Sequence, residues 1–342
     1  MRPKKLSSLG EFAAIERIQG ICKRPGRDVT VGIGDDAAAY RVPDGYITLA
    51  SCDMLIEGVH FDLGSAGYRS LGYKALAVNL SDIAAMGGRP RYYMVAAALG
   101  RKADEKDLGE LYQGIESAAA PHKVRAIGGD TCGTSGPVVI SVTVIGEARP
   151  KDIIRRSGAR PGDDIYVTGT LGDSAGGLVL LKSGGGRKRI SPVPTDGLDA
   201  DYLISRHLMP TPRVKAGMVL AEAGLATSMI DVSDGLSSDL MHIMEQSGAG
   251  ALVYAESVPL SGGLKKTFGD KKALRLALHG GEDYELLFTA RPGSRAKLQG
   301  LKKRAGTSIT LIGSVTEGGG AFLVSGDGGR KALRPGGYEH FR

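Results

Sequence analysis

The sequence predicts a two-domain α/β protein, and three observations support this fold class. The chain has 342 residues, which suits two domains of roughly 150 residues better than one. Predicted strands and helices alternate in both halves. A charged, turn-rich segment at residues 147–164 separates the halves. We therefore place the boundary close to residue 150 and expect domains at 1–150 and 151–342.

The first half contains strands of apolar and β-branched residues and helices with apolar residues at helical spacing. Residues 138–145 (VVISVTVI) are the clearest strand, since β-branched residues fill nearly all of it. The predicted order is a strand at 46–51 that ends at Cys52-Asp53, a helix at 69–86, a strand at 91–99, a helix at 105–119, a strand at 123–127 that leads into Gly128-Gly129-Asp130, and the strand at 138–145.

The second half repeats this alternation after a Gly-rich turn. Its predicted elements are a strand at 165–168, a helix at 174–182, a turn-rich loop at 183–198, a further helix, a strand at 228–232, a helix at 235–246 and strands at 251–255 and 284–289. The pattern does not show whether the sheets are parallel, mixed or antiparallel.

The composition excludes several classes of protein. No apolar run approaches the ~20 residues that span a bilayer, and the first residues lack the apolar stretch of a secretory signal. Three scattered cysteines without a CxxC pair indicate a reducing compartment, so we expect a cytoplasmic protein without membrane contact.

The net charge of +7 does not by itself indicate a nucleic-acid-binding protein. The basic residues are dispersed, only 5% of residues are aromatic and Trp is absent, so no stacking surface for bases is evident. We expect no nucleic-acid partner. A positive balance also suits an enzyme whose substrates carry phosphate. One basic run, Arg187–Arg189, lies in the Gly-rich loop and is either a solvated charge run or a basic lid over phosphates.

Six acidic motifs recur along the chain, mostly at strand ends or Gly-containing turns, where α/β proteins bind ligands. Each alone is best explained as a turn or a helix N-cap. If several converge, carboxylates ~4 Å apart repel by about 4 kcal/mol at an effective dielectric near 20, and cations must balance them. The motifs are Gly34-Asp35-Asp36, Cys52-Asp53, Ser81-Asp82, Gly129-Asp130, Asp231–Asp234 and Gly281-Glu282-Asp283.

The residue types indicate which cation these motifs would bind. Oxygen ligands favour Mg²⁺ or Ca²⁺, and the absence of a His/Cys set argues against zinc. The EF-hand spacing is also absent. Carboxylate-held Mg²⁺ completed by phosphates is common at phosphoryl-transfer sites, so the sequence favours that chemistry.

Familiar nucleotide and hydrolase motifs do not account for the chain. It has no GxxxxGK[ST] phosphate-binding loop. The partial GxGxxG at residues 32–37 carries an acidic pair that would repel a pyrophosphate. A GxSxG nucleophile motif is missing as well.

Motifs along nearly the whole chain resemble those of the thiamine-monophosphate kinase family, in the family's order. They include VGIGDDAA, DMLIEGVHF, LGYKALAVNLSDIAAMG, IGGDT, RRSGARPGD, VTGTLGDSAGGL, DVSDGLSSDL, GGEDYELLF and the terminal GYEHF. The resemblance implies the aminoimidazole ribonucleotide synthetase-like fold. In this fold an N-terminal ATP- and Mg-binding sheet domain dimerises with its mate, and a C-terminal α/β domain completes the active site.

The resemblance also implies the site residues. Several Mg²⁺ ions would bridge the ATP phosphates, and the implied metal ligands are Asp36, Ser51, Cys52, Asp53, Asp82, Asp130, Asp231 and Asp234. Of these, Asp130, Asp231 and Asp234 would stabilise charge through Mg²⁺. The implied nucleotide contacts are Gly129, Asp130, Arg156, Ser233 and Tyr112, and the implied thiamine monophosphate contacts are His60, Glu282 and Tyr338.

One position departs from the family pattern, which usually has Thr where this chain has Cys52. A thiol is a poor Mg²⁺ ligand, so a water or backbone oxygen takes that position or one metal site is weakened.

The implied reaction is in-line attack of the thiamine monophosphate phosphate on the γ-phosphorus of ATP, which gives thiamine diphosphate. The attacking oxygen is already anionic, so no general base is required. Two alternatives stay open. One is another ATP-using enzyme of the superfamily, of the aminoimidazole ribonucleotide synthetase or hydrogenase maturation dehydratase type. The other is a non-catalytic binder of phosphate ligands.

Overall fold

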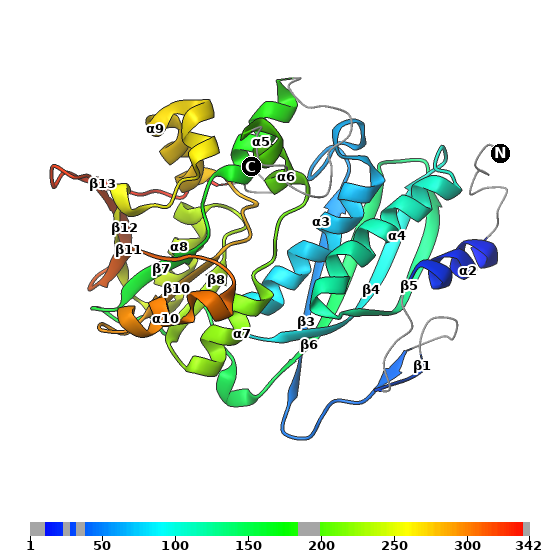
Figure 1. Cartoon of the computed structure of the whole chain (residues 1–342), viewed down its shortest axis with the longest axis horizontal. Coiled ribbons are helices and arrows are strands. Elements are labelled where there is room, and N and C mark those ends of the chain that lie inside the picture. Colours follow the sequence, from blue (N-terminus) through cyan, green and yellow to red (C-terminus); the bar gives the residue numbers. More distant parts are fainter. Residues whose placement is uncertain (1–10, 23–27, 32–37, 184–198, 338–342) are drawn as a thin grey trace. The chain divides into compact units, whose positions relative to one another are not determined.

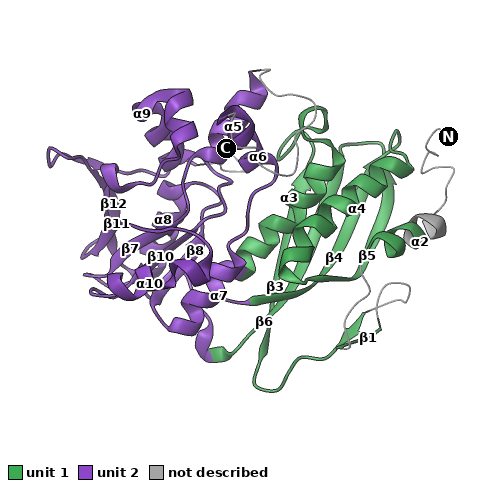
Figure 2. Cartoon of the chain, viewed as in Figure 1, with its two compact units in different colours: residues 1–83, 89–150 green, residues 84–88, 151–342 purple. Residues whose placement is uncertain are grey.

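The computed structural model describes residues 11–22, 28–31, 38–183 and 199–337. The chain divides into two compact units (Figure 2). Unit 1 comprises Met1–Ile83 with Arg89–Pro150, and unit 2 comprises Ala84–Gly88 with Lys151–Arg342. Within the described ranges, every helix is too short or too polar to span a bilayer.

Unit 1 is built on a mixed four-stranded sheet with the order β3-β6-β4-β5. β6 pairs antiparallel with β3 and β4, whereas β4 pairs parallel with β5. The elements are α2 (Glu11–Ile21), β1 (Val29–Val31), β2 (Ala39–Tyr40), β3 (Ile47–Ile56), α3 (Leu63–Ala85), β4 (Arg89–Gly100), α4 (Glu105–Ala119), η1 (Ala120–His122), β5 (Arg125–Thr134) and β6 (Val139–Ala148). β1 and β2 form a separate small sheet.

Helices α3 and α4 lie side by side over one face of this sheet (Figure 1). Their close approach depends on two glycines. A Cβ at Gly72 would lie under 3.0 Å from the carbonyl of Leu111, and one at Gly114 would clash in the same way with the carbonyl of Arg69. α4 begins with a capping box, because the Asp104 carboxylate accepts from the Asp107 backbone and the Asp107 carboxylate accepts from the Asp104 backbone.

The two faces of the four-stranded sheet differ in burial. Val142 and Val144, both 0% exposed, pair with Asp53 and Ser51, so these two residues of β3 lie on the helix-covered face. Their neighbours Cys52 and Met54 point to the opposite face, because side chains alternate along a strand. Met54 is 52% exposed.

Unit 2 is built on a seven-stranded sheet with the order β13-β12-β9-β11-β7-β10-β8. All its pairs are antiparallel except β12 with β9. Its elements are η2 (Pro150–Asp152), β7 (Asp164–Thr168), α5 (Asp173–Lys182), α6 (Asp199–Leu208), α7 (Val214–Ala223), β8 (Ala226–Asp231), α8 (Leu236–Ser247), β9 (Gly250–Tyr254), η3 (Ala255–Ser257), α9 (Gly262–His279), β10 (Leu286–Ala290), α10 (Arg295–Ala305), β11 (Ile309–Thr316), β12 (Gly320–Val324) and β13 (Arg330–Ala332). Its core includes Ile165, Ile230, Leu240 and Val253.

Two predicted strand ends were wrong. β3 continues through Cys52 and Asp53 to Ile56, because it pairs with β6 over its whole length. β5 likewise continues through Gly129 and Asp130 to Thr134, paired with β4. The two acidic motifs therefore lie within strands and not after them.

Candidate functional site

The first group of predicted residues lies in unit 1, where β3 meets α3. We call Ser51, Asp53, Asn79 and Asp82 the Asp53 cluster. The Asp53 backbone N–H donates to Asn79 Oδ1 at 2.9 Å, and the Ser51 hydroxyl hydrogen-bonds to an Asp82 carboxylate oxygen. Ser51 Oγ also lies 3.3 Å from Asn79 Oδ1. The Ser51 side chain and the Asp53 backbone of β3 are thus held to two side chains of α3 by direct polar contacts.

Asn79 was not predicted from the sequence, yet it organises this cluster. It is 0% exposed, and its Nδ2 donates to the Ala75 carbonyl at 3.1 Å. That bond fixes the amide so that its oxygen points to β3. A polar Asn inside an otherwise apolar helical stretch, one turn before Asp82, is the signal that could have identified it.

The electrostatics of the Asp53 cluster favour a cation. Burial, followed by the nearby Asp82 carboxylate, raises the pKa of Asp53 to about 6. At neutral pH the two carboxylates therefore carry like charges in a half-buried setting. The surrounding donors are carboxylate, hydroxyl and amide oxygens, which are the ligand types that Mg²⁺ takes. The residues present fit a Mg²⁺ site.

The Cys52 thiol does not lie with this cluster. It points to the opposite sheet face, where its Sγ lies 3.5 Å from Ser141 Oγ. The alternation of side chains along β3 is the physical reason. The structure therefore brings Ser51 and Asp53 together with Asp82 but leaves the Cys52 side chain apart.

Asp130 and Gly129 lie on β5, beside β4. Asp130 is exposed and pairs with Ala96, which in turn pairs with Ser141, so Asp130 shares the sheet face of Cys52. Gly129 has a structural requirement of its own. A Cβ there would lie under 3.0 Å from the Val95 carbonyl, so only glycine allows β5 this close to β4.

Tyr112 and His60 both have local partners in unit 1. Tyr112 on α4 is only 4% exposed, its hydroxyl hydrogen-bonds with Thr131, and burial raises its pKa. Little of its ring is therefore accessible to an adenosine. His60, in the turn after β3, accepts the Ile56 backbone N–H at Nδ1 over 3.1 Å. Neutral His60 thus carries its proton on Nε2.

The second group lies in unit 2, at the end of β8. We call residues 231–235 the Asp234 turn; it connects β8 to α8. Asp231 is 3% exposed, and Ser233 and Asp234 are half-buried. The carboxylate of Asp239 on α8 accepts the backbone N–H of Asp234 at 3.1 Å and of Gly235 at 3.0 Å. Asp239 therefore fixes the turn that presents the predicted ligands.

Asp239 was also not predicted, and its ionisation is strongly affected by its position. Burial first, and then Asp231 and Asp234, raise its pKa to about 8. Single ligand atoms of Asp234, Asp239 and His242 lie within 4.8 Å of one another. This concentration of acidic groups fits a divalent cation at the Asp234 turn as well.

Glu282 lies directly against this turn. We call residues 281–285 the Glu282 turn. The Glu282 N–H donates to the Ser233 carbonyl at 2.7 Å, and the Tyr284 N–H donates to the Val232 carbonyl at 2.9 Å. A Cβ at Gly281 would lie under 3.0 Å from the Ser233 carbonyl, so glycine is needed there. The structure thus brings Glu282 next to Ser233 and Asp234.

The remaining predicted residues either have few contacts with the two groups or lie outside the described residues. Arg156 is exposed, and the carbonyl of its neighbour Arg155 accepts the Met229 N–H at 2.9 Å, so this segment runs beside β8. Gly337 donates its N–H to Ser238 Oγ at 3.2 Å. Asp36 and Tyr338, together with the basic run Arg187–Arg189, lie outside the described residues.

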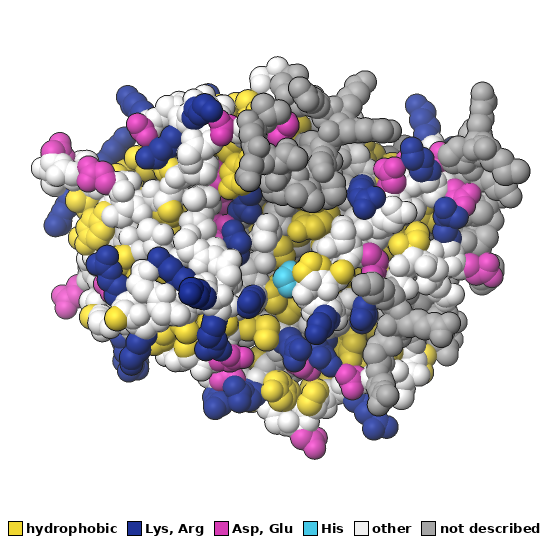
Figure 3. Space-filling view, viewed as in Figure 1, with side chains coloured by type: hydrophobic (Ala, Val, Ile, Leu, Met, Phe, Trp, Pro, Cys, Tyr) yellow, Lys and Arg dark blue, Asp and Glu magenta, His cyan; other side chains and the backbone are white. Residues whose placement is uncertain are grey.

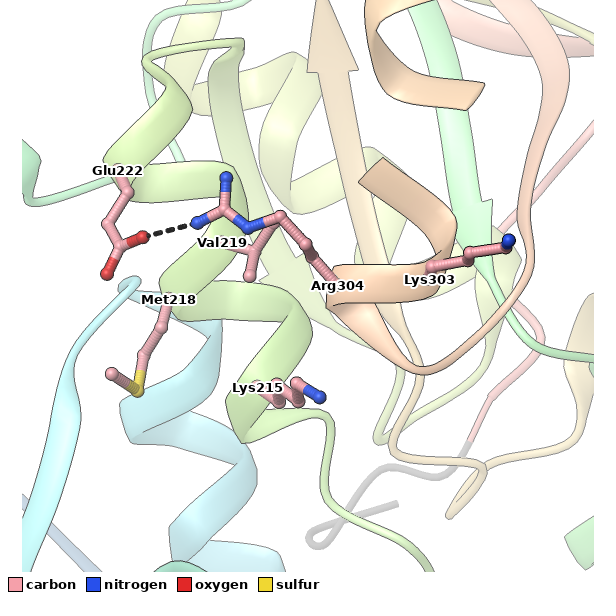
Figure 4. Close-up of a pocket in the computed structure, with 6 residues that line it drawn as sticks. All are labelled: Lys215, Met218, Val219, Glu222, Lys303 and Arg304. Atoms are coloured by element: carbon pink, nitrogen blue, oxygen red, sulfur yellow. Dashed lines mark hydrogen bonds and ion pairs between the residues drawn. The ribbon is translucent and has the colours of Figure 1, made fainter. Parts of the chain in front are cut away.

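A cavity of about 460 Å³ between α7 and α10 contains none of the predicted site residues. It is lined by Lys215, Met218, Val219, Glu222, Lys303 and Arg304. In Figure 4 the Arg304 guanidinium reaches Glu222, with which it forms an ion pair of 2.9 Å. Basic side chains elsewhere are scattered among acidic ones over the face shown in Figure 3.

Comparison with known families defines the class of protein. The N-terminal domain model of AIR synthase related proteins matches residues 34–148, and the C-terminal domain model matches residues 160–325. The chain is therefore an AIR synthase related protein with both domains of that class. This confirms the two-domain α/β fold.

Individual relatives define the family more closely. The chain is 41% identical to thiamine-monophosphate kinase of Escherichia coli (strain K12), over 97% of this chain and 98% of the relative. It is 38% identical to the enzyme of the same name from Bacillus subtilis (strain 168), over 92% and 94%. The chain belongs to the thiamine-monophosphate kinase family, and the resemblance seen in its motifs is confirmed.

Solved structures of thiamine-monophosphate kinases are similar to this chain as well. Thiamine-monophosphate kinase from Stenotrophomonas maltophilia K279a superposes with a TM-score of 0.83 at 39% identity, covering 94% of this chain and 98% of that one. AaThiL complexed with AMPPCP and TMP gives a TM-score of 0.73 at 34% identity, covering 100% and 99%. Hydrogenase maturation protein HypE in complex with ATP, at 22% identity and a TM-score of 0.71, shares the fold.

Proposed function

We propose that this chain uses ATP to phosphorylate thiamine monophosphate, giving thiamine diphosphate in thiamine diphosphate biosynthesis. The near full-length identity to thiamine-monophosphate kinases carries the proposal. AaThiL complexed with AMPPCP and TMP supports it, because AMPPCP is an ATP analogue with a non-transferable γ-phosphoryl group. ATP is therefore the donor and the phosphate of thiamine monophosphate the acceptor.

The chemical difficulty of this reaction is electrostatic. The acceptor oxygen is anionic at neutral pH, so proton removal is not needed. The two phosphate-bearing substrates repel each other instead. Positioning and charge neutralisation are the main contributions that a protein makes to phosphoryl transfer.

We propose that Mg²⁺ ions are held by the acidic residues of both units. When bound, Mg²⁺ neutralises phosphate charge and polarises the transferring group. The pKa of Asp53, raised by burial and then by Asp82, supports this assignment, because a nearby cation would stabilise the ionised carboxylate. In the proposed ligand set a backbone or water oxygen substitutes for the Cys52 thiol. The proposed ligands are Asp36, Ser51, Asp53, Asp82, Asp130, Asp231 and Asp234.

We propose separate roles for the residues that contact the substrates. Arg156 provides a bidentate phosphate contact, and Gly129 and Ser233 contact nucleotide phosphates. Glu282, His60 and Tyr338 line the thiamine monophosphate site. A carboxylate suits this ligand because the thiazolium ring of thiamine carries a positive charge. Tyr112 is a weaker candidate for contact with the adenosine, given its burial.

The comparisons favour kinase activity over the alternatives. The sequence identity to thiamine-monophosphate kinases reaches 41%. The sequence identity to HypE in complex with ATP is 22%, which shows a similar fold only. A non-catalytic binder has its only support in Cys52, whose thiol points away from the Asp53 cluster. The departure at Cys52 therefore does not alter the oxygen atoms of the Asp53 cluster.

We propose a homodimer formed through the four-stranded sheet of unit 1. In the described part of unit 1, α3 and α4 cover one face (Figure 1), and the other face presents small and apolar side chains such as Ala50, Met54 and Ala96, all exposed. A second copy of the same face would bury them. We also propose a cytoplasmic location, because Cys22, Cys52 and Cys132 are all unpaired thiols.

The proposed function is tested by incubating the purified protein with ATP, Mg²⁺ and thiamine monophosphate and following thiamine diphosphate by chromatography. We expect thiamine diphosphate to form with Mg²⁺ and to be absent with EDTA. Free thiamine in place of thiamine monophosphate is the acceptor control. No product in the complete mixture, with ATP still bound, would contradict the proposal and point to another acceptor.

A further inference from the structure

Two consecutive buried residues of α6 hold the Glu282 turn. The Arg206 side chain is 8% exposed, and its Nη2 donates to the Asp283 carbonyl at 3.3 Å and to Glu285 Oε1 at 2.9 Å. His207 is 5% exposed, and its Nδ1 lies 3.1 Å from Glu282 Oε2. Neither residue belongs to the motifs on which the site was predicted. Through them, α6 determines where the turn lies.

The contact between His207 and Glu282 bears on which imidazole nitrogen carries the proton. An ionised carboxylate can only accept a hydrogen bond, so a hydrogen bond within this pair requires the hydrogen on Nδ1. Ser174 Oγ also lies 3.1 Å from Nδ1 and can share this hydrogen as a second acceptor. The Glu282 carboxylate thus lies within ion-pair distance of a buried imidazole that can donate to it.

The Glu282 turn needs such support because its backbone is strained. Glu282 has φ 67° and Tyr284 has φ 52°, and Lys123 is the one other non-glycine residue with positive φ among the described residues. L-residues adopt this region at a cost, and the surrounding structure must hold them there. Asp283 supplies a second anchor, since its carboxylate accepts the N–H of Gly172 at 2.6 Å and of Ser174 at 3.1 Å.

The anchored turn keeps one functional group accessible. Asp283 and Glu285 are fully buried, whereas the Glu282 side chain is 25% exposed. The Glu282 carboxylate therefore contacts the buried His207 imidazole on one side and remains accessible to a ligand on the other. A site that must hold a cationic ring in a defined place requires this combination of rigidity and access.

We propose that His207 is a positioning residue that orients the Glu282 carboxylate toward the cationic thiazolium ring of thiamine monophosphate. This inference rests on the proposed function. His207 acts through Glu282 and does not touch substrate. Loss of the Nδ1–H donor therefore weakens binding of the acceptor and leaves ATP binding unchanged.

The test compares His207→Asn with His207→Leu, two side chains of nearly equal shape. The Asn amide nitrogen can replace Nδ1 as a donor, whereas Leu provides none. With the wild-type protein in the same series, we expect His207→Leu to raise the KM for thiamine monophosphate about tenfold. We expect the KM for ATP to stay within about twofold and His207→Asn to restore most of the lost affinity.

A double-mutant cycle separates positioning from general structural damage. If His207 acts through Glu282, His207→Leu adds no further rise in the KM for thiamine monophosphate in a Glu282→Ala background. Full additivity, or equal rises in both KM values, would overturn the inference. If the Leu variant does not fold, His207→Met, which also provides no N–H donor, takes its place in both comparisons.

The same series distinguishes failure of this inference from failure of the proposed function. A wild-type protein that makes no thiamine diphosphate contradicts the proposed function, and the inference falls with it. An active wild type whose KM for thiamine monophosphate is unchanged by His207→Leu overturns the inference alone.

Discussion

At the scale of single residues, some residues of the candidate site could be predicted from the sequence and others could not. Asp53 and Asp234 stand beside a predicted strand or a glycine, so local pattern identified them, whereas Asp82 was singled out inside the predicted helix 69–86 as one of six recurring acidic motifs. Asn79, Asp239 and His207 were missed for a physical reason. Asn79 and His207 act through contacts to residues 26 to 75 positions away, and Asp239 was hidden in a predicted helix. Short-range patterns do not report such partners.

Asp53 provides a prediction on pH and metal. Its folded-state pKa of about 6 lies above the ordinary value of 3.8, so the folded state favours the protonated form. The stability that this preference provides is present below pH 4 and is lost as pH rises through about 6. In EDTA we therefore expect the wild-type Tm to fall more between pH 4.5 and 7.5 than the Tm of Asp53→Asn.

The same pair of proteins reports on the proposed metal. At pH 7.5 without metal, Asp53→Asn should melt at a higher temperature than the wild type, because it removes a half-buried charge beside Asp82. Added Mg²⁺ should raise the Tm of the wild type more than that of the variant. Equal stabilisation of both by Mg²⁺ would exclude Asp53 from the metal ligands.

At the scale of elements, α4 was predicted more accurately than the end of β3, whereas α2, α9 and α10 were not predicted. α4 was predicted at residues 105–119 and occupies the same residues, because a capping box and an amphipathic pattern mark it. β3 was predicted to end at residue 51 but continues to Ile56. Strand pairing uses backbone groups, so β3 tolerates Cys52 and Asp53 where hydrophobicity alone suggested an end.

The crossing of α3 and α4 gives a matched pair of substitutions within one helix. Gly114→Ala places a Cβ under 3.0 Å from the Arg69 carbonyl, and we expect it to destabilise by about 3 kcal/mol. Gly109→Ala meets only Arg17 Nε, at 4.0 Å, and we expect it to stabilise by about 0.5–1 kcal/mol.

Urea denaturation of both variants measures the difference between them. A Gly114→Ala protein as stable as the wild type would show that the two helices are not packed this closely.

At the scale of the whole molecule, alternation of elements predicted the fold class but not the sheet orders. In unit 2, β7 pairs with β10 and β11, which lie more than a hundred residues further along the chain. No local sequence signal specifies such pairing. Resemblance over the full chain, and not periodicity, implied the fold that the family matches confirm.

The proposed dimer can be tested on the sheet face of unit 1 opposite α3 and α4. Met54 is 52% exposed there. In a two-fold interface, Met54→Arg would bring the introduced positive charges of the two copies into the same buried surface, where they repel. We expect a dimeric wild type and a monomeric variant by light scattering after size-exclusion chromatography. Phe322→Arg, at a 40% exposed position on β12 of unit 2, is the control and should remain dimeric. A Met54→Arg protein that stays dimeric would place the interface elsewhere.

The central claim is direct transfer of the γ-phosphoryl group from ATP to thiamine monophosphate. The most direct measurement follows the label from [γ-³²P]ATP in the presence of Mg²⁺ and thiamine monophosphate. The account predicts that the label appears in thiamine diphosphate in step with ADP formation. Label found only in inorganic phosphate would contradict the account, because it would show ATP hydrolysis or a synthetase reaction and not a kinase.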